Sequence, residues 1–346
     1  MKLGLLLDWE RAQGPFPVER VQLAERLGFD SIWSAESYGT DALTTLAYLA
    51  AVTRRIRLGT GVMQTAARAP TAAAMAVATL EKLAGEGRVI AGFGLSGPQI
   101  VEGWYGQAWG SPYWKLRDYI QIVRKMLERK EPVAHQGREI SLPYAGPGAL
   151  GVGKPLKSIQ RPNPDIPLWL GTGSEATVKL TAELADGWLP LGFVPGSMQT
   201  YQPWLDAGLV RAGGGKSLAD LEIQCGCQVV VTDDVRAAID GLKPFYAFLV
   251  GGMGHETKNF HKESMIRRGY REAADRIQEL FLAGRREDAI AAVPDAFIDE
   301  GGLIGPRERI RERFRAWEDS GATGMTLLTE SPEAMSLLAE LAGTQR

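Results

Sequence analysis

The first quarter of the chain alternates between short apolar runs and longer segments with a helical pattern. The apolar runs lie around Leu3, Ile32, Leu58 and Ile90, and the segments between them carry an apolar residue at every third or fourth position. Short apolar runs predict strands, and the periodic segments predict amphipathic helices. Because strand and helix alternate and the strands are apolar on both faces, we predict a parallel sheet covered by helices.

The same alternation returns in the second half of the chain. Apolar runs around Leu168, Trp188, Val229 and Leu327 bring the number of predicted strands to eight, which is the number in a (β/α)8 barrel, the TIM barrel. We therefore predict an α/β protein of this class with insertions after strands 4 and 7. No low-complexity linker divides the chain, so we expect a single domain over residues 1–346, with the insertions at about 100–160 and 251–300.

Composition and charge narrow the range of functions. Hydrophobic residues make up 45% and charged residues 23% of the chain, and the formal net charge is −2, which argues against a nucleic-acid partner or an anionic membrane surface. No apolar run approaches the ~20 residues of a membrane span, and the apolar N-terminal run is too short for a signal peptide. Cys225 and Cys227 are expected as buried strand residues, and such low cysteine use fits a reducing cytoplasm.

A glycine motif follows the fourth predicted strand. Gly92, Gly94 and Gly97 spell G-x-G-x-x-G, which in a Rossmann domain binds a dinucleotide. That motif belongs to the first strand–helix turn of its unit and needs an acidic residue about 20 positions further on, at a strand end. Here the segment after Pro98 is predicted as a loop, and Asp118 falls within a predicted helix. The glycines then either turn the chain or let another cofactor approach the backbone.

The loops that follow the predicted strands are candidate ligand contacts, because the active site of a TIM barrel lies at the C-terminal ends of its strands. The loops after the third, fourth and fifth strands are glycine-rich and carry few charges, so their backbone can approach a large flat ligand. After the fifth strand, Ser174 and Thr177 stand at a predicted helix start, where N–H groups and the helix dipole favour a phosphate. The alternative for Ser174 is an ordinary helix cap.

Several segments together resemble the bacterial-luciferase-like superfamily, in its branch of flavin- and deazaflavin-dependent oxidoreductases. The order and spacing of two long segments carry the resemblance: LGTGVMQTAARAPTAAAMAVATLEKLAGEGRVIAGFGLSG and IPLWLGTGSEATVKLTAELADGWLP. The segment SGPQIVEGWYGQAWGSP is similar to an actinobacterial subgroup associated with coenzyme F420. The resemblance implies the barrel fold, F420 as cofactor, hydride transfer to or from a small organic substrate, and a homodimer. The alternative is an FMN-dependent monooxygenase that uses reduced flavin and O2.

The resemblance also assigns residues to the site. Glu36 is expected at the edge of the cofactor ring as the catalytic general acid, and Ser37 stands where many relatives have a histidine. A non-prolyl cis peptide is expected between Gly61 and Val62, against one face of the ring. The complete set of expected cofactor contacts is Asp8, Ser37, Gly61, Val62, Met63, Gln64, Gly94, Leu95, Ser96, Gly97, Gly171, Thr172, Gly173, Ser174 and Thr177.

Other candidate groups leave alternatives open. Glu102 is a second candidate acid, and with Glu36 it would form the carboxylate pair of a barrel hydrolase. The absence of histidine at position 37 would also fit a protein that binds the cofactor without catalysis. Lys258, in a glycine-rich segment over residues 251–263, could belong to a lid that reaches the cofactor phosphate. The aromatic residues within 104–114 either pack the insertion or line the substrate pocket, and no histidine has metal-ligand spacing.

Overall fold

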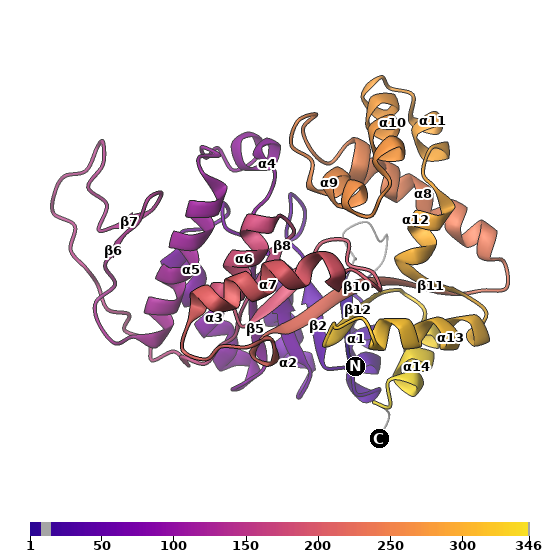
Figure 1. Ribbon diagram of the computed structural model, residues 1–346. Helices are drawn as coiled ribbons and strands as arrows, with labels where there is room; N and C mark the ends of the chain where they lie inside the picture. The colour runs from indigo at the N-terminus through magenta and orange to yellow at the C-terminus, as the bar shows by residue number, and fades with distance from the viewer. Residues whose placement is uncertain (8–14, 345–346) are drawn as a thin grey trace.

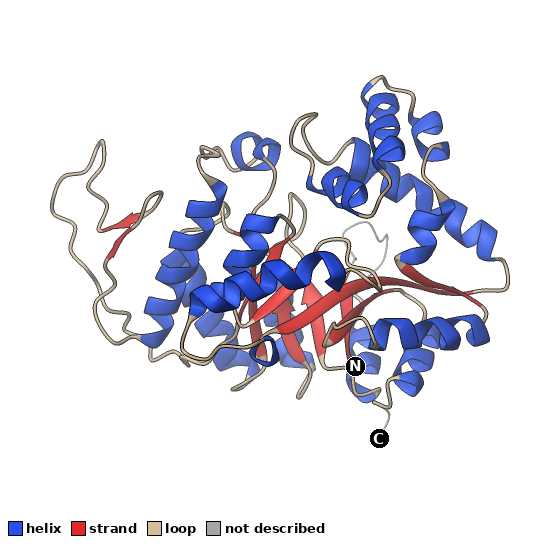
Figure 2. Ribbon diagram, viewed as in Figure 1, coloured by secondary structure: helices blue, strands red, loops and turns tan. Residues whose placement is uncertain are grey.

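Eight parallel strands close into a barrel in the computed structural model, which describes residues 1–7 and 15–344. The barrel strands are β1 (Lys2–Leu7), β2 (Ser31–Ser34), β3 (Arg57–Thr60), β5 (Val89–Gly94), β8 (Leu168–Thr172), β9 (Gly187–Pro190), β10 (Glu222–Val231) and β12 (Gly324–Leu328). The ring closes because β10 pairs with both β9 and β12, and β12 pairs with β1. Figure 1 and Figure 2 show the strands at the centre of the molecule with helices around them. The predicted fold class and all eight predicted strands are confirmed.

Helices connect the strands along the outside of the barrel. They are α1 (Val18–Arg26), α2 (Ala42–Val52), α3 (Pro70–Ala84), α6 (Glu175–Leu184), α7 (Met198–Ala212), α13 (Arg307–Glu318) and α14 (Pro332–Leu341), with a short 3-10 helix, η1 (Leu218–Asp220), before β10. Local sequence signals bound these helices: Asp41 accepts a hydrogen bond of 2.6 Å from the N–H of Thr44 at the start of α2, and Gly85 ends α3 with a φ of 104°. Within residues 1–7 and 15–344, no helix is both long and apolar enough to cross a membrane.

The connection between β5 and β8 forms the first insertion. It contains α4 (Pro98–Gly103), α5 (Pro112–Glu128) and the hairpin of β6 (His135–Gln136) and β7 (Ser141–Leu142), which stands out at the left of Figure 1. The prediction of a loop after Pro98 is wrong, because α4 begins at that proline, directly after the glycine motif. Proline fits the first helical position, where its missing N–H is not needed and its φ is already helical. A Rossmann dinucleotide site is therefore excluded because the strands form a closed barrel. The absence of a helix after the glycine motif is no longer an argument, since α4 is present.

The connection between β10 and β12 holds the second insertion. It comprises α8 (Val235–Gly251), α9 (Phe260–Arg267), α10 (Arg271–Leu282), α11 (Arg286–Ala291), α12 (Asp295–Glu300) and β11 (Gly302–Gly305), before α13. The five helices form the orange group at the upper right of Figure 1 and bury an apolar cluster of their own, which includes Ile239, Met265 and Ile277. The sequence did not predict β11, which pairs in parallel with the last residues of β10, Gln228 to Val231. Because β11 begins and ends with glycine, its apolar run is only Leu303 and Ile304, which is too short to predict a strand.

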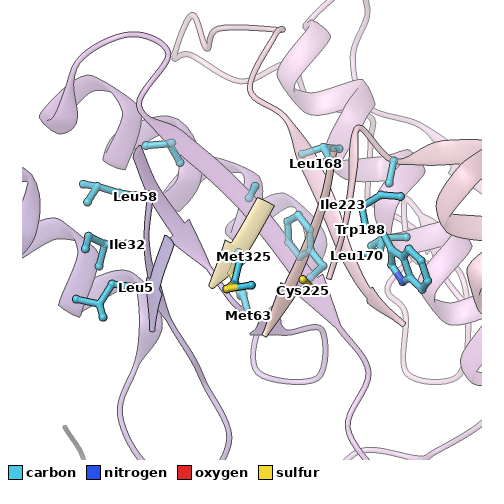
Figure 3. Close-up of a cluster of buried hydrophobic side chains, with 14 of the residues drawn as sticks. Leu5, Ile32, Leu58, Met63, Leu168, Leu170, Trp188, Ile223, Cys225 and Met325 are labelled. Atoms are coloured by element: carbon cyan, nitrogen blue, oxygen red, sulfur yellow. The ribbon is translucent and has the colours of Figure 1, made fainter. Parts of the chain in front are cut away.

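The barrel strands bury side chains on both faces. Leu5 and Ile32 belong to the large cluster between the strands and the surrounding helices (Figure 3). Trp33 and Trp169 form a separate cluster with Ile90 in the barrel interior, and their ring centroids are 5.2 Å apart. Consecutive strand residues point to opposite faces, so apolar residues at successive positions supply both clusters.

Charged residues close the N-terminal end of the barrel. Arg57 on β3 lies 2.6 Å from Asp30 and 2.9 Å from Glu222 of β10, and Lys2 lies 2.7 Å from Glu222. Burial works to raise the pKa of Glu222, but hydrogen bonds from Arg57 and Lys2 outweigh it and lower the pKa. These ion pairs close the N-terminal end of the barrel, and the tryptophan cluster fills its interior. A ligand would therefore approach from the C-terminal ends of the strands.

Candidate active site at the C-terminal end of the barrel

Glu36 follows β2 and is held in a buried ion pair. Its Oε1 and Oε2 accept hydrogen bonds of 2.7 and 2.9 Å from the guanidinium of Arg68, and Oε2 accepts another of 2.8 Å from the N–H of Gln64. Glu36 is only 8% exposed. The ion pair joins the loop after β3 to the loop after β2. We call this end of the barrel, formed by the loops after β2, β3, β5, β8 and β9, the barrel mouth. The role of Glu36 as a general acid stays a prediction, because both its oxygens already have partners.

Arg68 is the cation that organises this side of the barrel mouth. Besides Glu36, it pairs with Asp41 at 2.6 Å, and its carbonyl accepts a hydrogen bond of 3.0 Å from the hydroxyl of Tyr119. Burial works to lower the pKa of Arg68, but the hydrogen bond and charge of Glu36 outweigh it and raise the pKa. Burial also raises the pKa of Tyr119, so its hydroxyl keeps its proton at neutral pH. Arg68 was not assigned to the site from sequence, although it lies in the loop after the third strand.

The peptide bond between Gly61 and Val62 is cis, as the resemblance implied. The flanking backbone is tied to β2 and its loop, because the N–H of Gly61 donates to the carbonyl of Ser34 at 2.8 Å and the carbonyl of Val62 accepts from the N–H of Glu36 at 3.2 Å. The loop then continues into β4 (Met63–Gln64), which pairs with the end of β5. The tip of β3 is therefore anchored on both sides.

The side chain of Val62 explains two of the predicted site glycines. A Cβ atom on Gly94 would lie 2.4 Å from one methyl of Val62, and a Cβ on Gly171 would lie 2.7 Å from the other. Both distances are far below van der Waals contact, so glycine is required where β5 and β8 meet this side chain. Glycine at these two positions is therefore explained by the space that Val62 needs, without any contact to a ligand.

The three glycines of the G-x-G-x-x-G motif have three different surroundings. A Cβ on Gly92 would lie 1.9 Å from the carbonyl oxygen of Thr60. The hydroxyl of Thr60 also accepts a hydrogen bond of 2.8 Å from the N–H of Gly92 and donates one of 2.7 Å to its carbonyl. Gly94 accommodates Val62, whereas a Cβ on Gly97 would meet no atom within 4 Å. Only Gly97 therefore faces open space in which a ligand could approach.

Three buried polar atoms around the barrel mouth have no hydrogen-bond partner among residues 1–7 and 15–344. They are Ser37 Oγ, Gln64 Oε1 and Arg267 Nε. The amide nitrogen of Gln64 does have one, since it donates to the carbonyl of Glu36 at 2.9 Å, which orients the side chain. Buried polar atoms in folded proteins are nearly always bonded, so these atoms mark positions where a polar ligand would fit.

The turn after β8 carries the predicted phosphate site and is also a helix cap. Ser174 Oγ accepts from the N–H of Thr177 at 3.4 Å, and Thr177 Oγ1 accepts from the N–H of Ser174 at 3.2 Å, so the ordinary cap is present. The N–H groups of Glu175 and Ala176, between these two residues, lack an intrahelical acceptor, as at the start of every helix. The hydroxyl of Thr172 points elsewhere, since it is buried against Thr181 at 2.7 Å. Phosphate binding at this turn stays a prediction.

The remaining expected cofactor contacts differ in their exposure. Leu95 is half-buried and Ser96 is buried after β5. Met63 is completely buried in the large apolar cluster, so its side chain packs against the core. Asp8 lies outside the described residues. The structure therefore assembles the expected loops at one end of the barrel, while the side chains of Met63 and Thr172 face the protein interior.

Aromatic residues of the first insertion divide into two groups. Trp104 is 65% exposed, and its ring lies 6.4 Å from that of Tyr38 in the loop after β2. The hydroxyl of Tyr105 donates to the carbonyl of Ser37 at 2.8 Å, and burial raises the pKa of this hydroxyl. Tyr113 and Trp114, by contrast, pack on each other at the start of α5. Only the first group borders the barrel mouth.

The two carboxylates of the alternative hydrolase pair have different surroundings. Glu102 is exposed on α4, where it accepts a hydrogen bond of 3.3 Å from the N–H of Trp109. Glu36 is occupied by Arg68 and Gln64. Across the described residues, no group of three histidine, cysteine or acidic side chains could hold a metal ion.

A cavity of about 290 Å³ also opens at this end of the barrel. It lies where β1, β10 and β12 end, and an ion pair of 3.3 Å between Arg20 and Glu330 stands at its edge. The apolar side chains that line it are Leu6, Leu242, Phe245 and Leu328. A cavity of this size and character suits a small, largely apolar molecule.

The barrel, the cis peptide after β3 and the loops around it define a luciferase-like protein. The sequence profile of the luciferase-like monooxygenase family matches residues 9–324, and the chain belongs to this family, as the resemblance predicted. The chain is 45% identical to a Mycobacterium tuberculosis protein whose name provisionally assigns it as a coenzyme F420-dependent oxidoreductase, over 99% of both chains. It is 28% identical to a 5,10-methylenetetrahydromethanopterin reductase of Archaeoglobus fulgidus, over 88% of this chain and 86% of that one.

A solved structure supports the same fold. The coenzyme F420-dependent tetrahydromethanopterin reductase of Methanopyrus kandleri superposes with a TM-score of 0.77, covering 98% of this chain and 97% of that one. The sequence identity in this comparison is 22%, so the likeness bears on the fold. The helical insertions are therefore part of an architecture that extends over the full length of both chains.

Proposed function

We propose that this chain is an oxidoreductase that transfers a hydride between coenzyme F420 and a small organic substrate. The observation that carries the proposal is the 45% identity with the Mycobacterium tuberculosis protein over 99% of both chains. That alignment spans both insertions and every loop of the barrel mouth. F420 is therefore favoured over FMN, the alternative that the family as a whole leaves open.

The residues of the barrel mouth fit a large planar cofactor with an anionic tail. When bound, F420 supplies the hydride carrier, and the protein has to hold it, orient it and exclude water. In this proposal Val62 supports one face of the ring, while Ser37 Oγ and Gln64 Oε1, which lack partners in the protein, bond its polar edge. The turn at Gly173 and Ser174 holds the phosphate.

Tyr105 and Glu102 are the candidate acids beside the proposed cofactor. The Tyr105 hydroxyl is fixed at the carbonyl of Ser37, the position where relatives carry histidine, and its raised pKa keeps it protonated at neutral pH. Glu102 is exposed and stays the second candidate acid. Glu36 then acts by positioning the loops through Arg68, a role that its buried ion pair supports.

The proposed substrate is small and largely apolar. The exposed rings of Tyr38 and Trp104 border the barrel mouth, and four apolar side chains line part of the cavity beside Leu6 and Phe245, next to polar groups such as Gln228. Apolar surface of this kind binds an uncharged organic molecule through burial of its own apolar area.

Titration of the purified protein with F420 and with FMN tests the cofactor. We expect F420 to bind at least about tenfold more tightly, which corresponds to ~1.4 kcal/mol, because its longer anionic tail can engage more groups of the protein. Fluorescence of the deazaflavin and isothermal titration calorimetry measure the two affinities.

Two other results would change the proposal. Tight FMN binding without F420 binding would make the protein an FMN-dependent monooxygenase of the same family. F420 binding without oxidation or reduction of the cofactor by any of a panel of alcohols, ketones and enones would favour a cofactor-binding protein without catalysis.

We also propose that the protein forms a homodimer. Apolar side chains on the arm that follows β7 are strongly exposed: Leu150 by 88%, Val152 by 81% and Ile159 by 99%. Several strongly exposed apolar residues in one segment favour a protein interface there. Light scattering should give twice the monomer mass, and the triple substitution of these residues by serine should shift the protein to monomer. A monomeric parent protein would refute the dimer.

We also propose that the protein works in the cytoplasm. Cys225 and Cys227 lie buried on β10 as free thiols, which agrees with their predicted position, and burial raises the pKa of Cys225 to about 12. Free cysteines without a disulfide are consistent with a reducing compartment.

A further inference from the structure

Arg267, at the end of α9, carries an unpartnered charge. Among the described residues it is the one half-buried arginine with neither a hydrogen bond nor an ion pair, and its Nε is completely buried. The Nε of the neighbouring Arg268 is also buried and unbonded, but the charge of Arg268 is balanced, since it pairs with Glu300 at 3.1 Å and lies over the ring of Phe297. A half-buried guanidinium without an acceptor is unfavourable unless a ligand supplies one.

The guanidinium of Arg267 lies against the turn after β8. Its Nη2 is 3.3 Å from the position that a Cβ on Gly173 would occupy. One helical turn earlier, Ser264 fixes α9 to the end of β9 by donating a hydrogen bond of 3.1 Å to the carbonyl of Leu191. In Figure 1, α9 is the helix of the second insertion that lies toward α6 and β8. The insertion thus places one cation on the edge of the barrel mouth.

No carboxylate of the described residues lies within ion-pair distance of Arg267, although Glu263 stands one helical turn before it on α9. The acidic residue nearest in sequence to the turn, Glu175, is exposed and already paired with Lys179. On α9 itself, Lys262 is neutralised by Asp275 at 2.7 Å. An anion that entered beside Gly173 would therefore meet one free guanidinium and no competing unpaired carboxylate recorded within ion-pair distance of it.

We propose that Arg267 is a binding residue for the anionic tail of the cofactor and holds its phosphate or a following carboxylate between α9 and the turn at Gly173. This inference rests on the proposed function and adds a residue that only the second insertion supplies. A guanidinium presents a planar fork of donors that matches the oxygens of a phosphate or carboxylate. Nη2 lies beside the turn, and Nε is buried without a hydrogen-bond partner among the described residues.

The test compares two ligands that share a ring and differ in charge. F420 and the deazaflavin riboside, which lacks the phosphate and the acidic tail, are titrated by fluorescence into the parent protein, Arg267→Ala and Arg267→Lys. The exposed Arg271→Ala on the next helix is the matched control. We expect Arg267→Ala to weaken F420 binding roughly 10- to 100-fold and to leave riboside binding unchanged, as expected for loss of a charge-assisted hydrogen bond. Arg267→Lys should recover part of the loss.

Melting temperatures provide a readout independent of activity. Because Arg267 bonds no group of the described protein, Arg267→Ala without ligand should melt like the parent, while the stabilisation by F420 should shrink. Unchanged F420 affinity in Arg267→Ala would overturn the inference and leave the proposed function standing. An equal loss for both ligands, or a loss confined to a phosphorylated substrate, would overturn it as well. Failure of the parent protein to bind either deazaflavin would instead refute the proposed function on which the inference rests.

Discussion

Replacement of Arg68 by methionine is expected to destabilise the protein by about 3 kcal/mol and to weaken cofactor binding. The substitution leaves the carboxylate of Glu36, whose side chain is 6% exposed, without its cation, and it removes the ion pair with Asp41. Removing one partner of a buried pair costs more than the pair itself contributes, because the remaining charge stays desolvated. The free energy of unfolding from urea denaturation at pH 7 measures the loss.

Two further variants distinguish the buried charge from a loss of packing. Arg161→Met replaces an exposed arginine without a recorded ion pair and should change stability by less than about 0.5 kcal/mol. The double variant Glu36→Gln/Arg68→Met removes both charges, so it should be more stable than Arg68→Met alone. If Arg68→Met is as stable as Arg161→Met, the ion pair does not organise the barrel mouth.

Substitution of Gly92 by alanine is expected to cost at least about 3 kcal/mol, whereas Gly97→Ala should leave stability nearly unchanged. The new methyl at position 92 would lie 1.9 Å from the carbonyl oxygen of Thr60, a backbone atom of the neighbouring strand. Neither strand can move aside without breaking its ladder. At position 97 no atom lies within 4 Å, and the φ of −74° suits any residue.

Thermal unfolding and the yield of folded protein both measure the difference, since we expect Gly92→Ala to be recovered only in part. Gly94→Ala provides an intermediate case, because its methyl would meet the side chain of Val62 and not a backbone atom. Equal stability of Gly92→Ala and Gly97→Ala would show that the close approach of β3 and β5 is not a constraint on the motif.

The eight strands and most of the helices between them could be predicted because each depends on an apolar run or a helical period within one short segment. Leu5, Ile32 and the apolar residues beside them form the strand runs, and Asp41 and Gly85 mark helix ends locally. The pattern did not predict α7, between β9 and β10. The hydrophobic pattern also did not predict elements that are only a few residues long. The helix that begins at Pro98 and the strand β11 offered too few apolar positions to show a period.

The site could be predicted at the level of loops. A TIM barrel brings the ends of its strands together, so the loops after β2, β3, β5 and β8 were expected to meet, and the resemblance added the cis bond after Gly61. The sequence could not predict why a particular residue type stands at a given position of the site. Gly94 and Gly171 are glycines because Val62 fills the space beside them, a contact between three separate strand ends.

By itself the sequence determined the barrel, its two long insertions and the set of loops at the C-terminal end, because these follow from local periodicity and from the closure of parallel strands. Only the tertiary structure decided that Glu36 is neutralised by Arg68, that Met63 and Thr172 face inward, and that Arg267 reaches Gly173. The physical reason is that ion pairs and close contacts act between side chains in space. Residues from different strands and from the second insertion become neighbours only when the barrel has closed.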